Sequence, residues 1–219
     1  MGDDNQQRHL NLIRNYSKAN HHRMYSHSIR KWEKEAKAVV TEMERCQFDT
    51  PNSLILDVGC SIGRYEKTLG GKEYHIIGLD VSSSALLEAH QNVPQADFVA
   101  ADVMQLPFPN QRFDVVLSVE ILHHFTDALL EKVLNEITRV IKPRGYLFFD
   151  IKNKLNPALA RAYLREDSAS MTLKARTLKS FRRSLSQRGL RIISQKGLFF
   201  PIATLAPFIM VVARKEPAK

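Results

Sequence analysis

The segment Leu54–Tyr65 constrains the fold of this chain more than any other, because it joins an apolar run to a glycine-containing loop. Its sequence, LILDVGCSIGRY, begins as a buried strand, turns at Asp57 and Gly59, and reaches Gly63 four positions later. A strand, loop and helix in this order are typical of α/β proteins that bind a nucleotide-like cofactor. The glycines let the backbone approach a ligand, and the following helix directs its free N–H groups to the same place.

Two other cofactor loops share this outline, and the sequence disfavours both. A P-loop ends in Gly-Lys-Ser/Thr, whereas here Gly63 is followed by Arg-Tyr. A dinucleotide loop reads G-x-G-x-x-G, whereas this loop spaces its glycines four residues apart and carries Asp57 before the first. A carboxylate at that position would repel pyrophosphate, but it would attract a ligand that carries an ammonium and a sulfonium group.

Polar side chains also stand at the ends of three further predicted strands. HIIGLDVS ends in Asp80, at the separation from the loop at which an acid accepts hydrogen bonds from a ribose diol. FVAADVMQLPF places Asp102 where a carboxylate can take an adenine amino group, and RFDVVLSVE ends in a polar stretch. Such ends line one crevice of an open α/β sheet, so one ligand can touch all of them. The sequence therefore predicts a cofactor site at Asp57, Gly59, Cys60, Ser61, Gly63, Asp80, Val81, Ser82, Asp102, Val103, Ser118, Val119 and Glu120.

Together these motifs resemble class I S-adenosylmethionine-dependent methyltransferases, and most of all the ubiquinone and menaquinone biosynthesis methyltransferase group. The resemblance rests on LDVGCSIG, IIGLDVS, ADVMQLPFPNQRFDVVLS, LHHF and RVIKPRGYLFF, and it covers roughly residues 54–150. It implies S-adenosyl-L-methionine as cofactor and a Rossmann-like, doubly wound α/β fold. The family's sheet has seven strands in the order 3-2-1-4-5-7-6, with an antiparallel last strand. One departure is Ser61, where the family usually has glycine.

Length and composition favour a single methyltransferase domain over residues 1–219. Residues 1–50 predict an N-terminal helical cap, residues 51–150 the cofactor-binding core, and residues 151–219 a basic part that completes the sheet. We expect helices over residues 129–141 and 177–188, a turn at 142–145 and a strand over 146–151. The cap's apolar helix face is expected to consist of Trp32, Ala36, Val39, Val40 and Met43.

The chain shows no signal peptide and no metal-binding motif, and its two cysteines, Cys46 and Cys60, make no disulfide framework. The longest apolar stretch, Leu198–Ala213, is shorter than a membrane span and contains two prolines. It is expected to form two strands joined by a loop. The sequence therefore predicts a cytoplasmic protein without a metal.

The positive charge of the chain is concentrated at its C-terminal end. Residues 151–219 hold 15 Lys and Arg against 3 Asp and Glu, whereas the whole chain has a net charge of +9. Lys179, Arg182 and Arg183 lie on the predicted helix there and are candidates for contact with an anionic partner, either RNA or a membrane surface. A solvated helix face is the equally weighted alternative.

The chemistry implied by the resemblance is in-line attack on the sulfonium methyl group, which depends mainly on positioning and on the exclusion of water. His123 and His124 follow the fourth predicted strand, and a histidine near its usual pKa of about 6.5 could serve as a base. Packing and capping are the alternative role for this pair. Glu120 is expected to orient the cofactor or the acceptor.

Three functions stay open at this point. A methyltransferase for a small-molecule or lipid-linked acceptor fits the helical cap best, and the methylated atom is not determined. An RNA methyltransferase, acting on tRNA, is favoured by the basic C-terminal part. A protein that binds the cofactor without catalysis is favoured only by Ser61.

Overall fold

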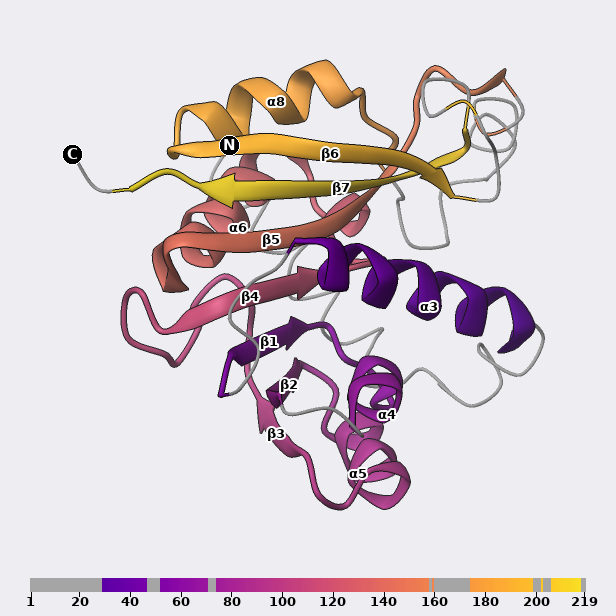
Figure 1. Ribbon diagram of the computed structural model, residues 1–219, viewed down its shortest axis with the longest axis vertical. Helices are drawn as coiled ribbons and strands as arrows, with labels where there is room; N and C mark the ends of the chain where they lie inside the picture. The colour runs from indigo at the N-terminus through magenta and orange to yellow at the C-terminus, as the bar shows by residue number, and fades with distance from the viewer. Residues whose placement is uncertain are drawn as a thin grey trace.

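The computed structural model describes residues 29–46, 52–70, 74–157, 159, 174–198, 202 and 206–217, and in its first helix the side chains from Glu35 onward. This part of the chain forms a mixed β-sheet with helices on both faces (Figure 1). The seven strands are β1 (Leu54–Val58), β2 (His75–Asp80), β3 (Asp97–Ala100), β4 (Phe113–Ser118), β5 (Ile141–Lys152), β6 (Leu190–Leu198) and β7 (Phe208–Lys215).

The helices alternate with the strands along most of the chain. They are α3 (Ile29–Arg45), α4 (Arg64–Leu69), α5 (Ser83–Asn92), the short 3-10 helix η1 (Leu122–His124), α6 (Asp127–Val140) and α8 (Leu178–Ser186). Side-chain hydroxyls start three of them: Ser82 caps α5, Thr126 caps α6 and Thr177 caps α8. Each accepts a hydrogen bond from an N–H of the first turn that the helix itself leaves unpaired.

The strand order is β3-β2-β1-β4-β5-β7-β6, which confirms the predicted fold. Strands β1 to β5 are parallel to one another, because a helix or a long connection returns the chain to the same edge each time. Strand β7 is antiparallel to both β5 and β6, as predicted. The carboxyl ends of β1, β2, β3 and β4 therefore meet at one edge, which we call the carboxyl edge.

Alternate residues of the central strands supply the two halves of the core. Ile55 and Phe148 face the side covered by α3 and α4, whereas Leu56 and Phe149 face the side covered by α6 and α8. Burial on both faces explains why these strands read as continuous apolar runs in the sequence. It also fixes the direction of every strand side chain near the carboxyl edge.

The helix α3 packs against the sheet through the apolar face that the sequence predicts. Ala36, Val39, Val40 and Met43 are buried; the Trp32 side chain lies outside the described residues. The C-terminal end of α3 is held by polar contacts, in which Lys196 of β6 and Arg45 donate to the carboxylate of Glu42.

Two predicted boundaries were wrong. The turn expected at residues 142–145 is an irregularity inside β5, where four residues stand between the pairs Phe113–Ile141 and Val115–Tyr146. Arg144 takes a left-handed φ of 66° there, which lets the chain resume pairing. Among the described residues, the stretch Leu198–Ala213 holds the last residue of β6 and the larger part of β7 instead of two complete strands.

Candidate functional site

The loop after β1 is closely tied to the end of β2. The N–H groups of Gly59 and Cys60 both donate to the carbonyl oxygen of Leu79, at 2.6 and 3.1 Å. Gly59 has a φ of 79°, and a Cβ on it would lie 2.0 Å from the side chain of Ile121. Only glycine therefore fits this position, because a side chain would strain the backbone and also collide with Ile121.

Ser61 also adopts a left-handed conformation, with a φ of 51°. This conformation is unfavourable for a residue with a side chain, and it persists when neighbouring contacts hold it. Here Asp80 provides that contact, because its Oδ2 accepts a hydrogen bond of 3.0 Å from the N–H of Ser61. Its Oδ1 accepts a second one, of 2.8 Å, from the N–H of Ser82. Asp80 thus joins the cofactor loop to the start of α5, a structural role that the sequence did not predict.

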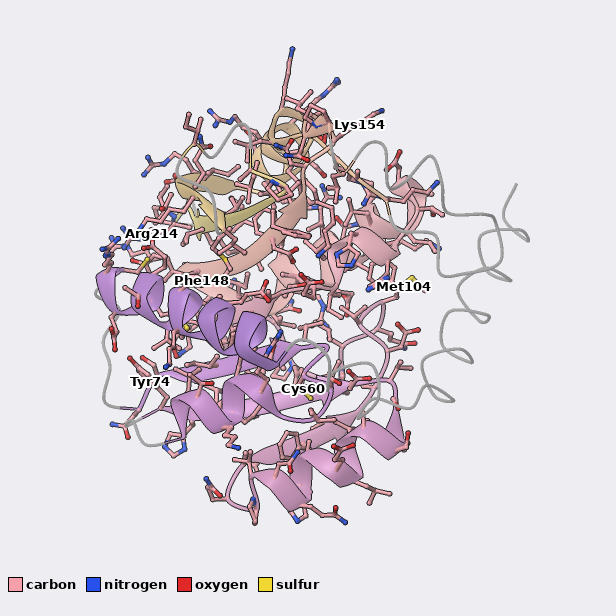
Figure 2. All side chains as sticks on the ribbon, turned by 90° about the vertical axis from the view of Figure 1, so that its right-hand side faces the viewer. Cys60, Tyr74, Met104, Phe148, Lys154 and Arg214 are labelled. Carbon is pink, nitrogen blue, oxygen red and sulfur yellow. The ribbon has the colours of Figure 1, made fainter. Side chains whose placement is uncertain are left out.

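The next predicted group, Asp102, begins the connection between β3 and β4. Its Oδ1 accepts a hydrogen bond of 2.9 Å from the N–H of Met104, and its own backbone carbonyl accepts one from Gln105. Val103 is buried beside it, in the core cluster that contains Leu56. Figure 2 looks onto the carboxyl edge and shows Cys60 of the cofactor loop and Met104 of this connection on the same side of the molecule.

Asp57, at the end of β1, is the group that most strongly indicates a ligand. Its side chain is buried, and its Oδ2 has no hydrogen-bond partner among the described residues. Burial raises the pKa of Asp57 to about 7; the Arg64 guanidinium opposes this rise and the Asp80 carboxylate adds to it. A buried acid without a partner is costly, so a cation that reaches Asp57 would be bound favourably.

The end of β4 carries a network of charges. Glu120 has a left-handed φ of 63°, and its N–H donates to Asp150 Oδ1 at 2.5 Å. The Lys152 ammonium lies 2.6 Å from Glu120 Oε1 and 3.6 Å from Asp150 Oδ2. Asp150 and Lys152 are buried, whereas the Glu120 side chain is 34% exposed. The network therefore holds Glu120 in its strained conformation at the carboxyl edge.

Sequence reasoning missed Asp150, Lys152 and Glu35 as members of this site. Glu35 comes from α3, and burial raises its pKa to about 7, with Glu120 as the largest charged contributor. Asp150 and Lys152 are two residues apart on β5, where they looked like part of a buried strand. Charged residues at the end of a strand whose neighbours also end in acids are the signal that could have identified them.

The two histidines of η1 lie against each other, with ring centroids 4.1 Å apart. The pKa of His124 is lowered to about 4, mainly by burial; Glu120 opposes this fall and Lys152 contributes to it. Burial, followed by His124 and Lys152, holds the pKa of His123 well below its usual range. The sequence-based value of about 6.5 was therefore too high, because it assumed solvent around both rings. Both histidines are neutral at pH 7, so a base role for them stays a prediction.

The remaining predicted site residues surround these groups. Ser118 and Val119 are buried at the end of β4, and the Ser118 hydroxyl has no hydrogen-bond partner among the described residues. Val81 is half-buried after β2. Gly63, with a φ of 82°, precedes α4, and a Cβ on it would lie 3.3 Å from Ala89 of α5.

One set of possible metal ligands occurs among the described residues. Atoms of Glu120, His123 and Asp150 lie within 4.8 Å of one another. However, the Lys152 ammonium already contacts both carboxylates, and a divalent cation would be repelled by it. The Lys152 ammonium therefore balances the charge of the two carboxylates, and no metal is needed to account for their close approach.

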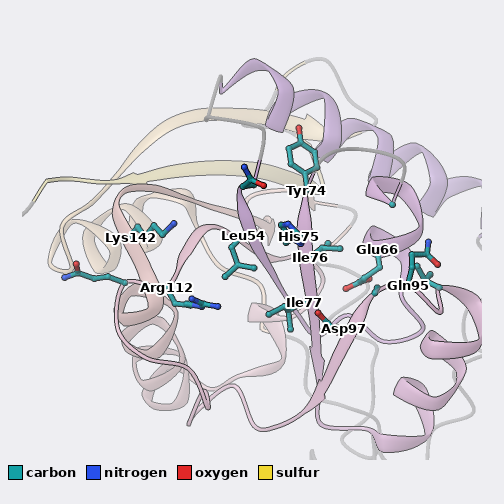
Figure 3. A pocket seen from close by; sticks show the side chains of 15 residues that line it. Leu54, Glu66, Tyr74, His75, Ile76, Ile77, Gln95, Asp97, Arg112 and Lys142 are labelled. Carbon is teal, nitrogen blue, oxygen red and sulfur yellow. The ribbon is translucent and has the colours of Figure 1, made fainter.

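A groove of about 720 Å³ lies at the opposite edge of the sheet, where the strands begin (Figure 3). Leu54, His75 and Asp97 start the strands β1, β2 and β3 there, and Arg112 and Lys142 line it as well. The groove therefore opens at the edge opposite the carboxyl edge; Glu66 of α4 lines it from within the sheet face, but none of the predicted site residues does.

Residues 56–149 match the family of methyltransferase domains. This segment contains the cofactor loop, Asp80, Asp102 and the network around Glu120. These residues form a methyltransferase domain.

Three relatives show how far the similarity of the methyltransferase domain extends. An uncharacterized methyltransferase of Synechocystis is 36% identical over 96 residues, which are 44% of this chain and 45% of the relative. A probable tRNA methyltransferase 9B of Mus musculus is 33% identical over 102 residues, 46% of this chain and 22% of the relative. A phthiotriol/phenolphthiotriol dimycocerosates methyltransferase of Mycobacterium ulcerans is 32% identical over 151 residues, 66% of this chain and 49% of the relative. The chain thus spans less than half the length of each.

The fold of the methyltransferase domain continues beyond the matched segment. The 1,6-didemethyltoxoflavin-N1-methyltransferase of Burkholderia thailandensis, solved with S-adenosylhomocysteine, has a TM-score of 0.73. It is 17% identical, and the alignment covers 97% of this chain and 90% of that chain. The likeness includes the C-terminal strands that complete the sheet.

The residues at the carboxyl edge fit S-adenosylmethionine as a cofactor. Its amino acid part carries an ammonium, and Asp57 offers a buried carboxylate oxygen without a partner among the described residues. The N–H groups of Gly59, Cys60 and Ser61 already donate within the protein, so the fit rests on the Asp57 carboxylate as a counterpart for the ammonium of the cofactor.

Proposed function

We propose that this protein transfers the methyl group of S-adenosylmethionine to a small-molecule or lipid-linked acceptor. The observation that carries the proposal is Asp57, an unpartnered buried acid beside a left-handed glycine loop in a methyltransferase domain. The mycobacterial relative, whose name gives dimycocerosates as its acceptors, supports a lipid-linked acceptor. Membership of the ubiquinone and menaquinone group is the finer form of the same proposal.

When bound, S-adenosylmethionine supplies a methyl group on a cationic sulfur, which leaves without help from an acid. We propose that Asp57 binds the ammonium of the cofactor, that Asp80 and Ser82 contact its ribose, and that Asp102 and Val103 contact its adenine. The acceptor would reach the same edge beside Glu120, whose side chain is the exposed member of the charge network. A neutral His124 could accept a proton from an acceptor there, although a pKa of about 4 makes it a weak base.

An RNA acceptor is the second candidate, and exposed charges on α8 favour it. Lys179, Arg182 and Arg183 are exposed, whereas Arg188 is paired with Glu131. Exposed cations on one helix suit phosphate groups. The relative named a probable tRNA methyltransferase supports this candidate. None of the helices within the described ranges is long and apolar enough to span a membrane, so a membrane role for this helix would be a surface contact.

Labelled methyl transfer tests the proposal. The protein is incubated with S-adenosylmethionine that carries an isotopically labelled methyl group and with separate lipid, small-molecule and RNA fractions of cells. We expect label in the lipid or small-molecule fraction, and its loss with the Asp57→Ala variant. Label in RNA alone would favour the second candidate, and no label in any fraction would leave only cofactor binding.

A further inference from the structure

Glu66, in the first turn of α4, is an acid that the proposed function does not use. Its side chain is completely buried, and neither carboxyl oxygen has a hydrogen-bond partner on another described residue. An acid in such surroundings is costly in its charged form. Some feature of the site must therefore account for an acid at this position.

The register of β1 and β2 shows where this carboxyl lies. Asp57 pairs with Gly78, and side chains of paired residues in adjacent strands point to the same face. A Cβ on Gly78 would lie 2.6 Å from Glu66 Oε1, so the Glu66 carboxyl fills the space of the missing side chain. The Glu66 carboxyl therefore lies next to the Asp57 side chain. Figure 3 shows it pointing from α4 toward the strands.

The core confirms that Asp57 points to the same side as α4. Ile55, two residues before Asp57, packs in the cluster that contains Tyr65 and Leu69 of α4. Since side chains alternate along a strand, Asp57 faces α4 as well. Two acids with unpartnered oxygens thus occupy one buried space beneath the cofactor loop.

The charges around this pair favour a proton on Glu66. Burial and the Asp57 carboxylate raise the pKa of Glu66 well above its usual range, while the backbone N–H of Glu66 itself and the Arg64 guanidinium oppose the rise. The other titratable groups near the two acids are Cys60 in the loop, Tyr65 on α4 and Asp80 on β2. Asp57 therefore ionises before Glu66 does.

We propose that Glu66 is a positioning residue of the cofactor site, a protonated carboxylic acid that donates a hydrogen bond to the Asp57 carboxylate. This inference rests on the proposed function, because the Asp57 carboxylate is expected to receive the cofactor ammonium. When the ammonium binds, the proton held by Asp57 passes to solvent and the proton of Glu66 stays. The Glu66 hydroxyl then donates to the Asp57 carboxylate while that carboxylate also accepts from the ammonium, so the pair carries one negative charge against one positive charge. Gly78 is required because any side chain there would displace Glu66.

Calorimetry with S-adenosylhomocysteine tests the role of Glu66 between pH 6 and pH 8. Glu66→Gln keeps a donor, so its Kd should stay within about twofold of the wild-type value. Glu66→Leu removes the donor at similar volume, and its Kd should rise roughly tenfold or more. The midpoint, the pH at which the affinity for S-adenosylhomocysteine is half its maximum, should also move to higher pH in this variant, because Asp57 ionises less readily without the donor. Glu131→Gln, on the opposite face of the sheet, is the matched control and should change neither quantity.

The result that would overturn the inference is a Glu66→Leu protein with wild-type Kd and midpoint. If that variant does not fold, the number of protons released on binding decides, measured in buffers of different ionisation enthalpy. Wild type and Glu66→Gln should both release about half a proton at pH 7, since only Asp57 loses one. A smaller release from Glu66→Gln would show that Glu66 gives up its own proton, which contradicts the inference. Failure of the wild type to bind S-adenosylhomocysteine would instead overturn the proposed function.

Discussion

Replacing Asp80 with Ala should weaken cofactor binding more than any other single change at the carboxyl edge. In the wild type, the two oxygens of Asp80 accept hydrogen bonds from Ser61 and Ser82, at 3.0 and 2.8 Å. The first of these bonds holds Ser61 in its left-handed conformation. The change therefore releases the cofactor loop and also removes the proposed acceptor for the ribose hydroxyls.

The size of the effect follows from the hydrogen bonds that are lost. A hydrogen bond to a charged group contributes roughly 1.5–3 kcal/mol. We expect binding to weaken by roughly 2–4 kcal/mol, since part of the loss appears as a less ordered loop in the free protein. This corresponds to about a 30-fold to 1,000-fold rise in Kd. The strands and their register should remain, because the sheet does not depend on this side chain.

Isothermal titration calorimetry with S-adenosylhomocysteine measures this effect directly. Asp114→Ala is a suitable control, because Asp114 also accepts a backbone hydrogen bond, from Leu54, and lies at the opposite edge of the sheet. The control should lose stability but keep its affinity. Equal Kd values for wild type and Asp80→Ala would refute the reasoning.

Three further predictions concern the charge network, the histidines and α8. Lys152→Met leaves Asp150 and Glu120 without their cation, so urea unfolding should show a loss of about 3–5 kcal/mol, partly recovered by adding Glu120→Gln. If His123 or His124 is the base, its change to Ala should lower kcat by roughly 10²–10⁴ with unchanged cofactor affinity. Because the pKa of His124 is about 4, its ring stays neutral between pH 6 and pH 8, and activity that depends on it should not fall toward pH 6. Full activity in both Ala variants would leave positioning as the mechanism. If Lys179, Arg182 and Arg183 bind RNA, their triple Ala variant should flatten the salt dependence of RNA binding by about two units, whereas loss of binding to anionic vesicles would indicate a membrane surface.

The positions of the strands along the chain were predictable because each one carries its own signal, whereas their order in the sheet was implied by the family resemblance. Continuous apolar runs that end in an acid or a glycine indicate parallel strands buried on both faces, and four of them follow in sequence. The cofactor loop was predictable for the same reason, since its glycines and its acid are local in the sequence. The exact start of β5 was not, because the irregularity at Arg144 depends on pairing with β4.

The contacts between distant residues were the part that sequence reasoning could not supply. Lys152 and Glu120 meet only because β4 and β5 are neighbours in the sheet. The low pKa of His124 likewise depends on burial by the folded chain. Nothing in the residues around Glu66 indicates that it is buried. Its inward direction is visible only in the folded chain, where its carboxyl occupies the place of a side chain on Gly78.

The account depends most on the carboxyl edge being the cofactor site. A crystal structure of the protein with S-adenosylhomocysteine tests this claim most directly. The account predicts ligand density with the amino acid part at Asp57, the ribose at Asp80 and the adenine at Asp102. Density at the groove of Arg112 and Lys142, or a ligand at the carboxyl edge that does not contact Asp57, would contradict it.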